Sequence, residues 1–531
     1  MTNAVTPISP KSSEHAEIYD LFIVGGGVNG VGIAADAQGR GLNVMLCEQS
    51  DLASATSSAS SKLIHGGLRY LEHYEFRLVR EALAEREVLL KNAPHLIKQL
   101  RFILPHRPHL RPAWMIRIGL FLYDHLSTRN QLLGSKGVKL QPGEDSNPLN
   151  DSIEYGFMYS DCRVDDSRLV VSNAISAEQN GAKILTRTRC QSAYRKDGLW
   201  HISLEDVDTG KITYCRARGL VNASGPWAQK FIETKLQAKS PRGVRLIKGS
   251  HFVVPKMYDG DQAYILQNED QRIVFVIPYN SDFTMIGTTD KEYQGDPKDV
   301  AIDDEERSYL LDVVNKHFAK QLTAEDIVWD WSGVRPLCDD ESTSPSAITR
   351  DYTLELETDD DSKAPLLSIF GGKITTYRKL SEAAVAELAP FYPNMGKAWT
   401  REAPLPGGDI EVAYDQWLDS IRKSYPWLVE RHLERVCNAY GSRVHMALGG
   451  AQTAADLGEH FGADLYANEV DYLIREEWAR SAEDIIWRRS KLGLYLSADQ
   501  VSRLDDYVRE RVPTLMNFKK LEGTGYRKVS G

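Results

Sequence analysis

The chain lacks the features expected of an exported or membrane-spanning protein. Its most apolar run, residues 113–123, is shorter than the ~20 residues that a membrane span needs, and it contains Arg117. Residues 1–16 are polar with no apolar core, which argues against a secretory signal and predicts a disordered leader. The six cysteines form no CxxC pair, so neither a metal site nor a disulfide framework is indicated. We therefore expect a reducing, cytoplasmic compartment.

An excess of positive charge is also missing. Lysine and arginine total 64 against 74 aspartate and glutamate, and the resulting net charge of −10 disfavours nucleic acid as the main partner. Any site for an anion must therefore be built locally. At 531 residues the chain exceeds the roughly 250–300 residues that one hydrophobic core usually serves, so we expect several domains.

What the sequence does contain is a dinucleotide-binding pattern near its start. An apolar strand, residues 21–24, runs into Gly25, Gly27 and Gly30 at GxGxxG spacing, and a helix of small residues follows. These glycines allow a tight turn, a close approach to a pyrophosphate and close helix packing, with the phosphates at a helix N-terminus. A second strand ends in Glu48, where a ribose hydroxyl would be held. Glu48 argues against a 2′-phosphate, which favours FAD or NAD over NADP.

Two further stretches are rich in glycine and hydroxyl groups. Residues 55–71 offer donors for phosphate or ring oxygens, although a solvated surface loop is the alternative. A strand at residues 366–370 runs into a glycine pair and a helix, which brings a second helix N-terminus to the same crevice. These two stretches favour FAD over NAD. Besides Gly25, Gly27, Gly30 and Glu48, the predicted cofactor contacts are Asn29, Ser57, Ser58, Ser60, Lys62, Leu63, His65, Ser224, Gly225, Gly371, Gly372 and Thr375.

The remaining patterns complete an α/β architecture. We predict a Rossmann-like FAD-binding domain, a strand-rich α+β substrate domain and an all-helical C-terminal cap domain. The aromatic residues of the last domain recur at helical spacing and are expected in its core. The predicted boundaries are a leader at 1–16, FAD-binding parts at 17–100, 161–244 and 352–403, a connecting helical and membrane-proximal segment at 101–160, the substrate domain at 245–351 and the helical domain at 404–531.

Several motifs in order resemble those of the FAD-dependent, respiratory-chain-linked sn-glycerol-3-phosphate dehydrogenases. That family belongs to the glutathione-reductase-like, D-amino-acid-oxidase-like flavoproteins, and the resemblance covers nearly the whole chain after the leader. The motifs are residues 23–30 (IVGGGVNG), 60–71 (SSKLIHGGLRYL), 333–337 (GVRPL), 349–352 (TRDY), 371–378 (GGKITTYR) and 487–493 (WRRSKLG).

The resemblance implies oxidation of sn-glycerol 3-phosphate to dihydroxyacetone phosphate by hydride transfer to FAD, with electrons passed to ubiquinone or a related quinone. Such a reaction needs a group that takes the hydroxyl proton and cations for a dianionic phosphate. His251 is the candidate base, with a structural histidine or neutral Lys373 as alternatives. The candidate catalytic residues are His251, Arg335 and Lys373, and the candidate substrate contacts are Arg69, Tyr70, Arg335, Arg350 and Lys373.

Three alternatives stay open at this stage. An oxidase of glycerol phosphate or of an amino acid would use oxygen in place of quinone, and a non-catalytic nucleotide-binding protein would not turn over. A homodimer is a further expectation. The quinone acceptor implies peripheral attachment to the inner face of the cytoplasmic membrane, and residues 100–126 combine arginine with aromatic residues suited to that surface. The alternative for this segment is an amphipathic helix packed beneath the cap domain.

Overall fold

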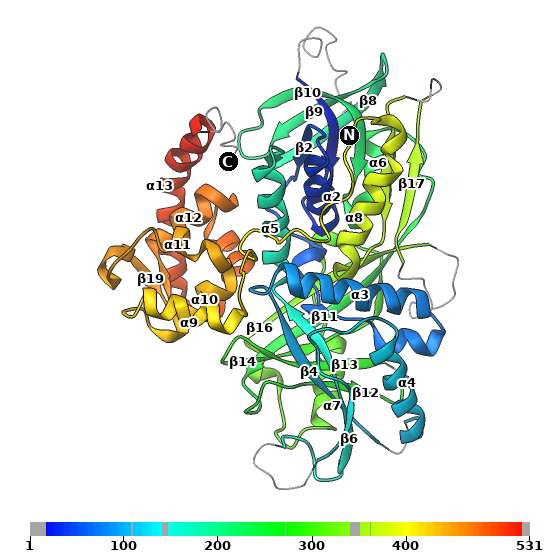
Figure 1. Ribbon diagram of the computed structural model, residues 1–531, viewed down its shortest axis with the longest axis vertical. Coiled ribbons are helices and arrows are strands. Elements are labelled where there is room, and N and C mark those ends of the chain that lie inside the picture. The colour runs from blue at the N-terminus through cyan, green and yellow to red at the C-terminus, as the bar shows by residue number, and fades with distance from the viewer. Residues whose placement is uncertain are drawn as a thin grey trace.

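The computed structural model describes residues 17–107, 110–140, 147–270, 272–339, 351–359, 361 and 363–522, without the side chains of 73 and 517–522. Two sheets lie one above the other, and a helical domain packs at their side (Figure 1). The helix α3 (Phe76–Asn92) lies between the sheets and contributes to the cores of both, with Val79 and Leu83 in one and Leu89 and Leu90 in the other. The arrangement confirms the predicted three-part α/β architecture.

The first sheet is the predicted Rossmann-like unit. Its central five strands are parallel, because each is followed by a crossover that returns the chain to the same edge. An antiparallel strand, β17, closes one side, and β8 (Thr188–Lys196) and β9 (Leu199–Asp206) extend β10 as the expected meander. The order is β17 (Thr353–Glu357), β18 (Leu366–Phe370), β10 (Ile212–Asn222), β1 (Ile18–Val24), β2 (Val44–Cys47) and β7 (Lys183–Leu185).

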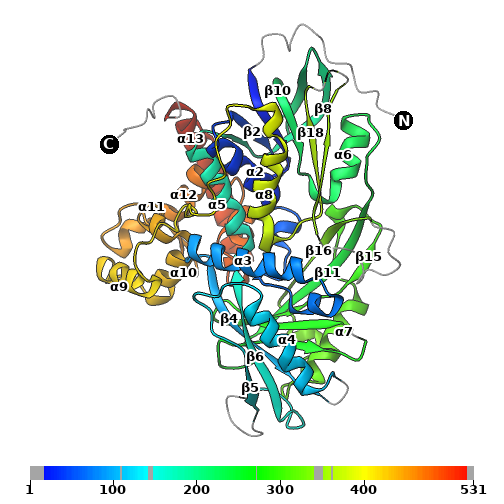
Figure 2. The same cartoon turned by 45° about the vertical axis from the view of Figure 1, so that its right-hand side comes forward.

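Helices cover both faces of this sheet. The small residues of α2 (Val28–Gly39) let it pack closely against its neighbours α5 (Asp166–Gln179) and α8 (Tyr377–Glu387) in one hydrophobic core. The short helix α6 (Ala228–Lys235) lies apart from these three, near β8 and β18 (Figure 2). The carboxyl ends of the parallel neighbours β1, β10 and β18 lie at the same edge of the sheet, where ligands of such folds bind.

The second sheet is strand-rich, as predicted for the substrate domain. Its strands are β15 (Lys291–Tyr293), β11 (Val244–Pro255), β14 (Phe283–Gly287), β13 (Ile273–Tyr279), β12 (Ala263–Gln267), β4 (Ile97–Pro105), β6 (Tyr155–Val164) and β3 (Leu63–Ile64), with β16 (Trp329–Cys338) on β11 and β5 (Lys136–Lys139) on β6. The segment 101–160, expected to be helical, contributes β5 and parts of β4 and β6 to this sheet. The last four residues of β4, 102–105, are all buried, so this part of the segment belongs to the core of the sheet and not to a surface helix.

Two helices flank this sheet. The helix α7 (Asp304–Asn315) begins with a capping box made by Asp303 and Glu306 and packs on the sheet through Leu310 and Val314. The helix α4 (Ala113–His125) begins after Pro112 and inserts Leu120 and Tyr123 into the core beside β4 and β6. In Figure 1 α4 lies on the opposite side of the molecule from the helical domain, so the alternative of packing beneath that domain is wrong.

The C-terminal domain is helical, as expected. It comprises α9 (Tyr414–Ser424), α10 (Glu430–Tyr440), α11 (Val444–Ala447), α12 (Ala467–Glu477), a π-helix (Asp484–Arg489) and α13 (Ala498–Glu522), with a small hairpin of β19 (His460–Gly462) and β20 (Leu465–Tyr466). Tyr472 lies in its core, and Trp417 and Trp427 pack on that core as predicted. Trp478 instead enters the core of the first sheet.

Buried ion pairs fix the helical domain to the first sheet. Arg168 of α5 donates to Glu477, and Arg489 donates to both oxygens of Asp51 at 2.8 and 2.9 Å. All four side chains are almost fully buried. Removing one partner of such a pair typically costs about 3–5 kcal/mol, because the other charge is left buried and unpaired. Among the described residues, no helix is long and apolar enough to cross a bilayer.

Candidate functional site

The turn between β1 and α2 has the shape of a phosphate cradle. Gly25 has φ +116°, and a Cβ there would lie 2.4 Å from the carbonyl oxygen of Ala223. A Cβ on Gly30 would lie 1.9 Å from the Gly25 oxygen, so the close packing of α2 on this turn requires glycine. A Cβ on Gly27 would meet only Ser57 Oγ, at 3.1 Å. The space in front of Gly27 is therefore open to a ligand at the N-terminus of α2.

Glu48, directly after β2, is hydrogen-bonded to that turn. Its Oε2 accepts from the Gly26 N–H at 2.7 Å, and its Oε1 accepts from the Ser50 N–H at 2.8 Å. Burial raises the pKa of this carboxyl, and the two backbone donors act in the opposite direction. Each oxygen keeps a second lone pair, so the predicted contact to a ribose hydroxyl fits this geometry.

The serine-rich loop divides into two parts with different roles. Ser57 Oγ accepts from the Val28 N–H at 3.0 Å, which places it at the mouth of α2, and Ser58 donates to the Ala55 carbonyl. Ser60 and Lys62 instead donate to Asp166 at the start of α5, at 2.7 and 2.9 Å. Their donors thus anchor the loop, and their predicted cofactor contacts remain predictions.

The loop then joins the second glycine turn. Leu63 is buried in β3, and the His65 N–H donates to Thr375 Oγ1 at 3.2 Å. The hydroxyl of Thr375 lies in the 3₁₀ helix Ile374–Thr376, just after the glycine pair. Two motifs separated by some 300 residues in sequence are therefore brought to one wall of the crevice.

The glycine pair itself contacts the first turn. Gly371 and Gly372 have φ of +78° and +100°, and the Gly371 carbonyl accepts from Asn29 Nδ2 at 3.3 Å. The other atom of that amide, Oδ1, is buried without a hydrogen-bond partner among the described residues. An acceptor so placed suits a ligand donor. At the third strand end, Ser224 donates to Asn222 at 2.6 Å, and Gly225 has open space where a Cβ would be. The glycine cradle and orphaned amide thus fit a bound dinucleotide.

The candidate base is held in the second sheet. His251 of β11 is 1% exposed, and its Nε2 is hydrogen-bonded to Ser61 Oγ at 2.9 Å. Its ring stacks on Trp331 of β16, with the centroids 5.1 Å apart and the planes inclined by 12°. Burial, and to a smaller extent the charges of Arg335 and Lys62, hold the pKa of His251 well below its usual range. The ring is therefore neutral near pH 7 and able to accept a proton.

Arg335 lies beside the histidine. Its guanidinium is 27% exposed, forms an ion pair with Asp290 and donates to Thr288 Oγ1 at 3.1 Å. A Cβ on Gly249 would lie 2.7 Å from Arg335 Nη2, so this glycine gives the arginine its room. A guanidinium has five N–H groups, so an arginine held in this way suits an anionic ligand.

Lys373 and Tyr70 contact each other. The Lys373 ammonium lies 3.9 Å from the centroid of the Tyr70 ring. Arg69, in the 3₁₀ helix Leu68–His73, is half-buried next to Tyr70. Arg350 lies outside the described residues. The predicted substrate contacts that are described thus come from β16 of the second sheet, from the 3₁₀ helix Leu68–His73 and from the turn after β18.

Strand β16 joins the two halves of the site. Thr56 of the serine loop donates to the Val334 carbonyl at 2.8 Å, and a Cβ on Gly333 would lie 2.7 Å from the Cβ of Ala59. A Cβ on Gly371 would lie 3.6 Å from the Pro336 oxygen. The strand that carries Arg335 therefore touches both glycine- and serine-rich walls of the predicted cofactor site.

Sequence reasoning missed several residues of this site. Asp166 pairs with Lys62 from 104 positions away, and no local spacing signals such a contact. Asp290 and Thr288 hold Arg335 from a neighbouring loop, and Trp331 covers His251. The alternation of Trp329 and Trp331 just before the GVRPL motif was a usable signal, because alternate residues of a strand share a face.

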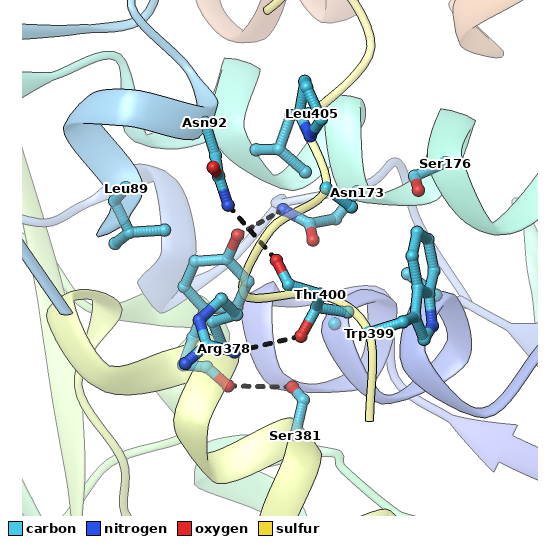
Figure 3. Close-up of a pocket in the computed structure, with 14 residues that line it drawn as sticks. Leu89, Asn92, Asn173, Ser176, Arg378, Ser381, Trp399, Thr400 and Leu405 are labelled. Atoms are coloured by element: carbon cyan, nitrogen blue, oxygen red, sulfur yellow. Dashed lines mark hydrogen bonds between the residues drawn. The ribbon is translucent and has the colours of Figure 1, made fainter. Parts of the chain in front are cut away.

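A small cavity lies away from these residues (Figure 3). It measures about 20 Å³, room for about one water molecule, and is bounded by α2, α3, α5, α8 and the linker to the helical domain. Thr400 of the linker accepts from Asn92 through its carbonyl at 3.2 Å and from Arg378 through its hydroxyl at 3.1 Å. None of the predicted site residues lines it. We interpret the cavity as part of the linker's anchorage.

Comparison with known proteins agrees with this geometry. Residues 20–378 match the family of FAD dependent oxidoreductases, and residues 398–518 match the C-terminal domain of alpha-glycerophosphate oxidase. The chain is 61% identical to a glycerol-3-phosphate dehydrogenase of Pseudomonas aeruginosa, over 97% of this chain and 98% of that protein. It is 50% identical to D-erythritol 1-phosphate dehydrogenase of Brucella abortus, over 91% and 96%.

Among solved structures, the glycerol-3-phosphate dehydrogenase of Bacillus halodurans complexed with FAD is similar, with a TM-score of 0.73 and 27% identity. The match covers 97% of this chain and 94% of that one. The FAD of that complex agrees with the cradle described above. The chain therefore belongs to the FAD-dependent oxidoreductase family and, within it, to the group of the glycerol-3-phosphate dehydrogenases.

Proposed function

We propose that this protein oxidises sn-glycerol 3-phosphate to dihydroxyacetone phosphate as an FAD-dependent dehydrogenase. The proposal rests on the position of two side chains. The buried, neutral His251 and the cation Arg335 lie on the paired strands β11 and β16. Strand β16 in turn contacts the serine-rich loop of the predicted cofactor site. Oxidation of a secondary alcohol that carries a phosphate needs a base for the hydroxyl proton and a cation for the phosphate. The relatives named for this substrate supply its identity.

The proton path follows from the exposure of two side chains. His251 is almost fully buried, whereas its hydrogen-bond partner Ser61 is only half-buried. The substrate hydroxyl gives its proton to Ser61 Oγ as that hydroxyl passes its own proton to Nε2 of the neutral ring. The hydride would leave the carbon that carries this hydroxyl group, and bound FAD would supply the acceptor. The alcohol thereby becomes a ketone with atoms and electrons balanced.

The phosphate is held by the cations around the crevice. Arg335 is pre-oriented by Asp290 and Thr288, and Arg69 and Lys373 extend the positive charge from the other wall. Guanidinium groups bind phosphate with two parallel hydrogen bonds, which favours them at this position. Tyr70 orients the substrate. Arg350, also predicted as a substrate contact, lies outside the described residues.

The electron acceptor in this proposal is a membrane quinone. The rival is oxygen, since residues 398–518 match a domain named for an oxidase. The test is turnover of sn-glycerol 3-phosphate with a soluble quinone analogue, in air and without air, with dihydroxyacetone phosphate and hydrogen peroxide both measured. We expect product in step with quinone and little peroxide. Equimolar peroxide in air would establish the oxidase, and binding of FAD without product would establish a non-catalytic protein.

The face of α4 supports attachment to a membrane surface. Trp114, Ile118 and Phe121 are 62%, 52% and 54% exposed, and with Met115 and Leu122 they form one apolar stripe. Arg111 lies next to it and is exposed. This combination suits the interface of an anionic bilayer, and we place the protein at the inner face of the cytoplasmic membrane. Arg101 takes no part, because it lies in β4 and donates to Ser160 Oγ at 2.7 Å.

Assembly as a homodimer is the last part of the proposal, and it rests on the sequence resemblance. Light scattering of the detergent-solubilised protein measures the mass directly. A mass near 120 kDa supports a dimer of the 59.7 kDa chain, and a mass near that of one chain excludes it.

A further inference from the structure

A row of aromatic rings runs from the helical domain to the candidate base. Trp487 of the π-helix stacks on Trp329 with centroids 4.4 Å apart and planes inclined by 15°. Trp329 packs on Trp331 at 4.6 Å, and Trp331 stacks on His251 at 5.1 Å. Trp329 and Trp331 share one face of β16, because they are two positions apart. The row therefore crosses from one domain to the other without a gap in stacking.

The outer end of the row is rigidly held. The residues after Trp487 are Arg488 and Arg489, and both donate to Asp51 of the first sheet. The Trp487 carbonyl accepts from Lys491 Nζ at 2.7 Å. A Cβ on Gly493 would lie 2.6 Å from the Trp487 ring, so this glycine makes the room in which the indole lies.

The His251 ring, at the inner end of the row, depends on the other rings for its orientation. The only hydrogen bond of the His251 ring among the described residues is the one between Nε2 and Ser61, and Nδ1 has no partner. A single hydrogen bond does not by itself fix the plane of the ring. A Cβ on Gly287 would lie 2.2 Å from the ring, so the ring packs against the backbone of β14 on that side. On its other side the ring stacks on Trp331, so the Gly287 backbone and the Trp331 indole together restrain its plane.

We propose that the C-terminal helical domain positions the His251 ring through Trp487, Trp329 and Trp331. In this role Trp487 is a positioning residue, and it acts without touching the substrate. The inference rests on the proposed function of His251. It assigns to the helical domain a part in the reaction, in addition to its own fold.

The charges that face His251 come from two other elements. Lys62 of the serine loop is paired with Asp166, and its ammonium lies 5.1 Å from the Trp331 centroid. Arg335 of β16 is paired with Asp290. Neither pair involves Trp487. A change at Trp487 therefore alters the packing and hydration of the ring while both charges stay in place.

The test compares Trp487→Leu with Trp417→Leu in the FAD-loaded protein. Trp417 is a half-buried tryptophan of the same domain that packs on Tyr414 and lies outside the row. Ring signals of ¹³C-labelled histidine, assigned to His251 with a His251→Asn variant, report its titration by NMR. Anaerobic flavin reduction by sn-glycerol 3-phosphate is followed over the same pH range.

In Trp487→Leu we expect water to reach the ring and its pKa to rise towards the ordinary value of about 6.5. At pH 6 only about one quarter of such a ring is neutral, so flavin reduction should fall about fourfold relative to pH 8. Trp417→Leu should titrate like the unchanged protein. Trp487→Phe should restore most of the original profile, because it keeps an aromatic face.

An unchanged His251 titration in folded Trp487→Leu would overturn the proposal. Should that variant not fold, Gly493→Ala gives the same test, since its methyl group displaces the indole by contact. An unshifted titration there would be equally decisive. If His251→Asn keeps the original pH profile of flavin reduction, the proposed base fails, whereas the NMR titration of Trp487→Leu still decides the positioning role.

Discussion

The two sheets contribute to the site by different means. The first sheet presents mainly backbone and open space, with glycines after β1, β10 and β18. The second presents side chains, with His251 and Arg335 each fixed by partners of its own. This difference indicates that the residues that bind the cofactor can be changed separately from those that act on the substrate. Changes in the first sheet should remove the cofactor, and changes in the second should spare it.

The largest expected effect is loss of cofactor in Gly27→Val. The side chain would occupy the open space in front of α2 where a pyrophosphate would lie, and the protein atom that it would crowd is the Ser57 hydroxyl oxygen, 3.1 Å from the added Cβ. We expect purified protein without flavin absorbance and without activity. Gly119→Ala is the matched control, because a Cβ at Gly119 meets nothing within 4 Å. Full flavin content in Gly27→Val would disprove the cradle.

The next effect is that of His251→Asn. Removing a general base typically costs about 10²- to 10⁴-fold, and flavin reduction should slow by that order with FAD retained. Because the pKa of His251 is lowered, the unchanged protein should keep its rate from pH 8 to below pH 6.5 and lose it only on further acidification. The variant should lack that acidic limb. His432→Asn, another buried histidine, is the control, and an equal loss there would point to general destabilisation.

Arg335→Ala should reduce activity less than His251→Asn does, and it should change both kcat/KM and the pH profile. Loss of a charge-assisted phosphate contact costs about 1.5–3 kcal/mol, or roughly ten- to hundredfold in kcat/KM. Loss of the nearby cation also raises the pKa of His251, so the acidic limb should move to higher pH. Steady-state kinetics across pH measure both, with the exposed Arg272→Ala as control. Unaltered kcat/KM with FAD bound would remove Arg335 from the phosphate site, and Arg69→Ala tests the other wall in the same way.

The smallest expected effect concerns α4. Arg111→Glu with Trp114→Ser should weaken co-sedimentation with anionic vesicles by about fivefold or more, since one basic residue near the surface contributes about 1 kcal/mol. Binding of the unchanged protein should also fall with added salt. Val429→Ser with Arg509→Glu, exposed positions of the helical domain, provide the control. Equal binding of both double variants would exclude α4 from the membrane contact.

The sequence predicted the first sheet better than the second. Glycine positions at β1 and β18 follow from local turn geometry, and such geometry is written in adjacent residues. The pairing of β4 with β6 and the ion pair of Lys62 with Asp166 depend on distant segments. Local pattern contains no information about them. For that reason Ser60 and Lys62 were predicted as cofactor contacts although their donors bond to Asp166.

The same limit applies to the base. His251 was predicted from its place beside Gly249 and Ser250 at a strand start and from the chemistry of the reaction. Its burial and the nearby charges of Arg335 and Lys62 lower its pKa and keep it neutral. Neither these effects nor its contacts with Ser61 and Trp331 are local in sequence. Trp487 was predicted to lie in the core of its own domain; it packs on that core and also stacks on Trp329 of the second sheet, a contact that local pattern does not show.

The most direct test of the account is anaerobic mixing of the yellow holoprotein with three compounds at equal concentration: sn-glycerol 3-phosphate, D-erythritol 1-phosphate and glycerol. The account predicts that sn-glycerol 3-phosphate bleaches the flavin fastest and that glycerol, which lacks the phosphate, leaves it yellow. Faster bleaching by D-erythritol 1-phosphate would contradict the assignment of sn-glycerol 3-phosphate as the substrate. Bleaching by glycerol as fast as by its phosphate, or no bleaching by sn-glycerol 3-phosphate, would contradict the site itself.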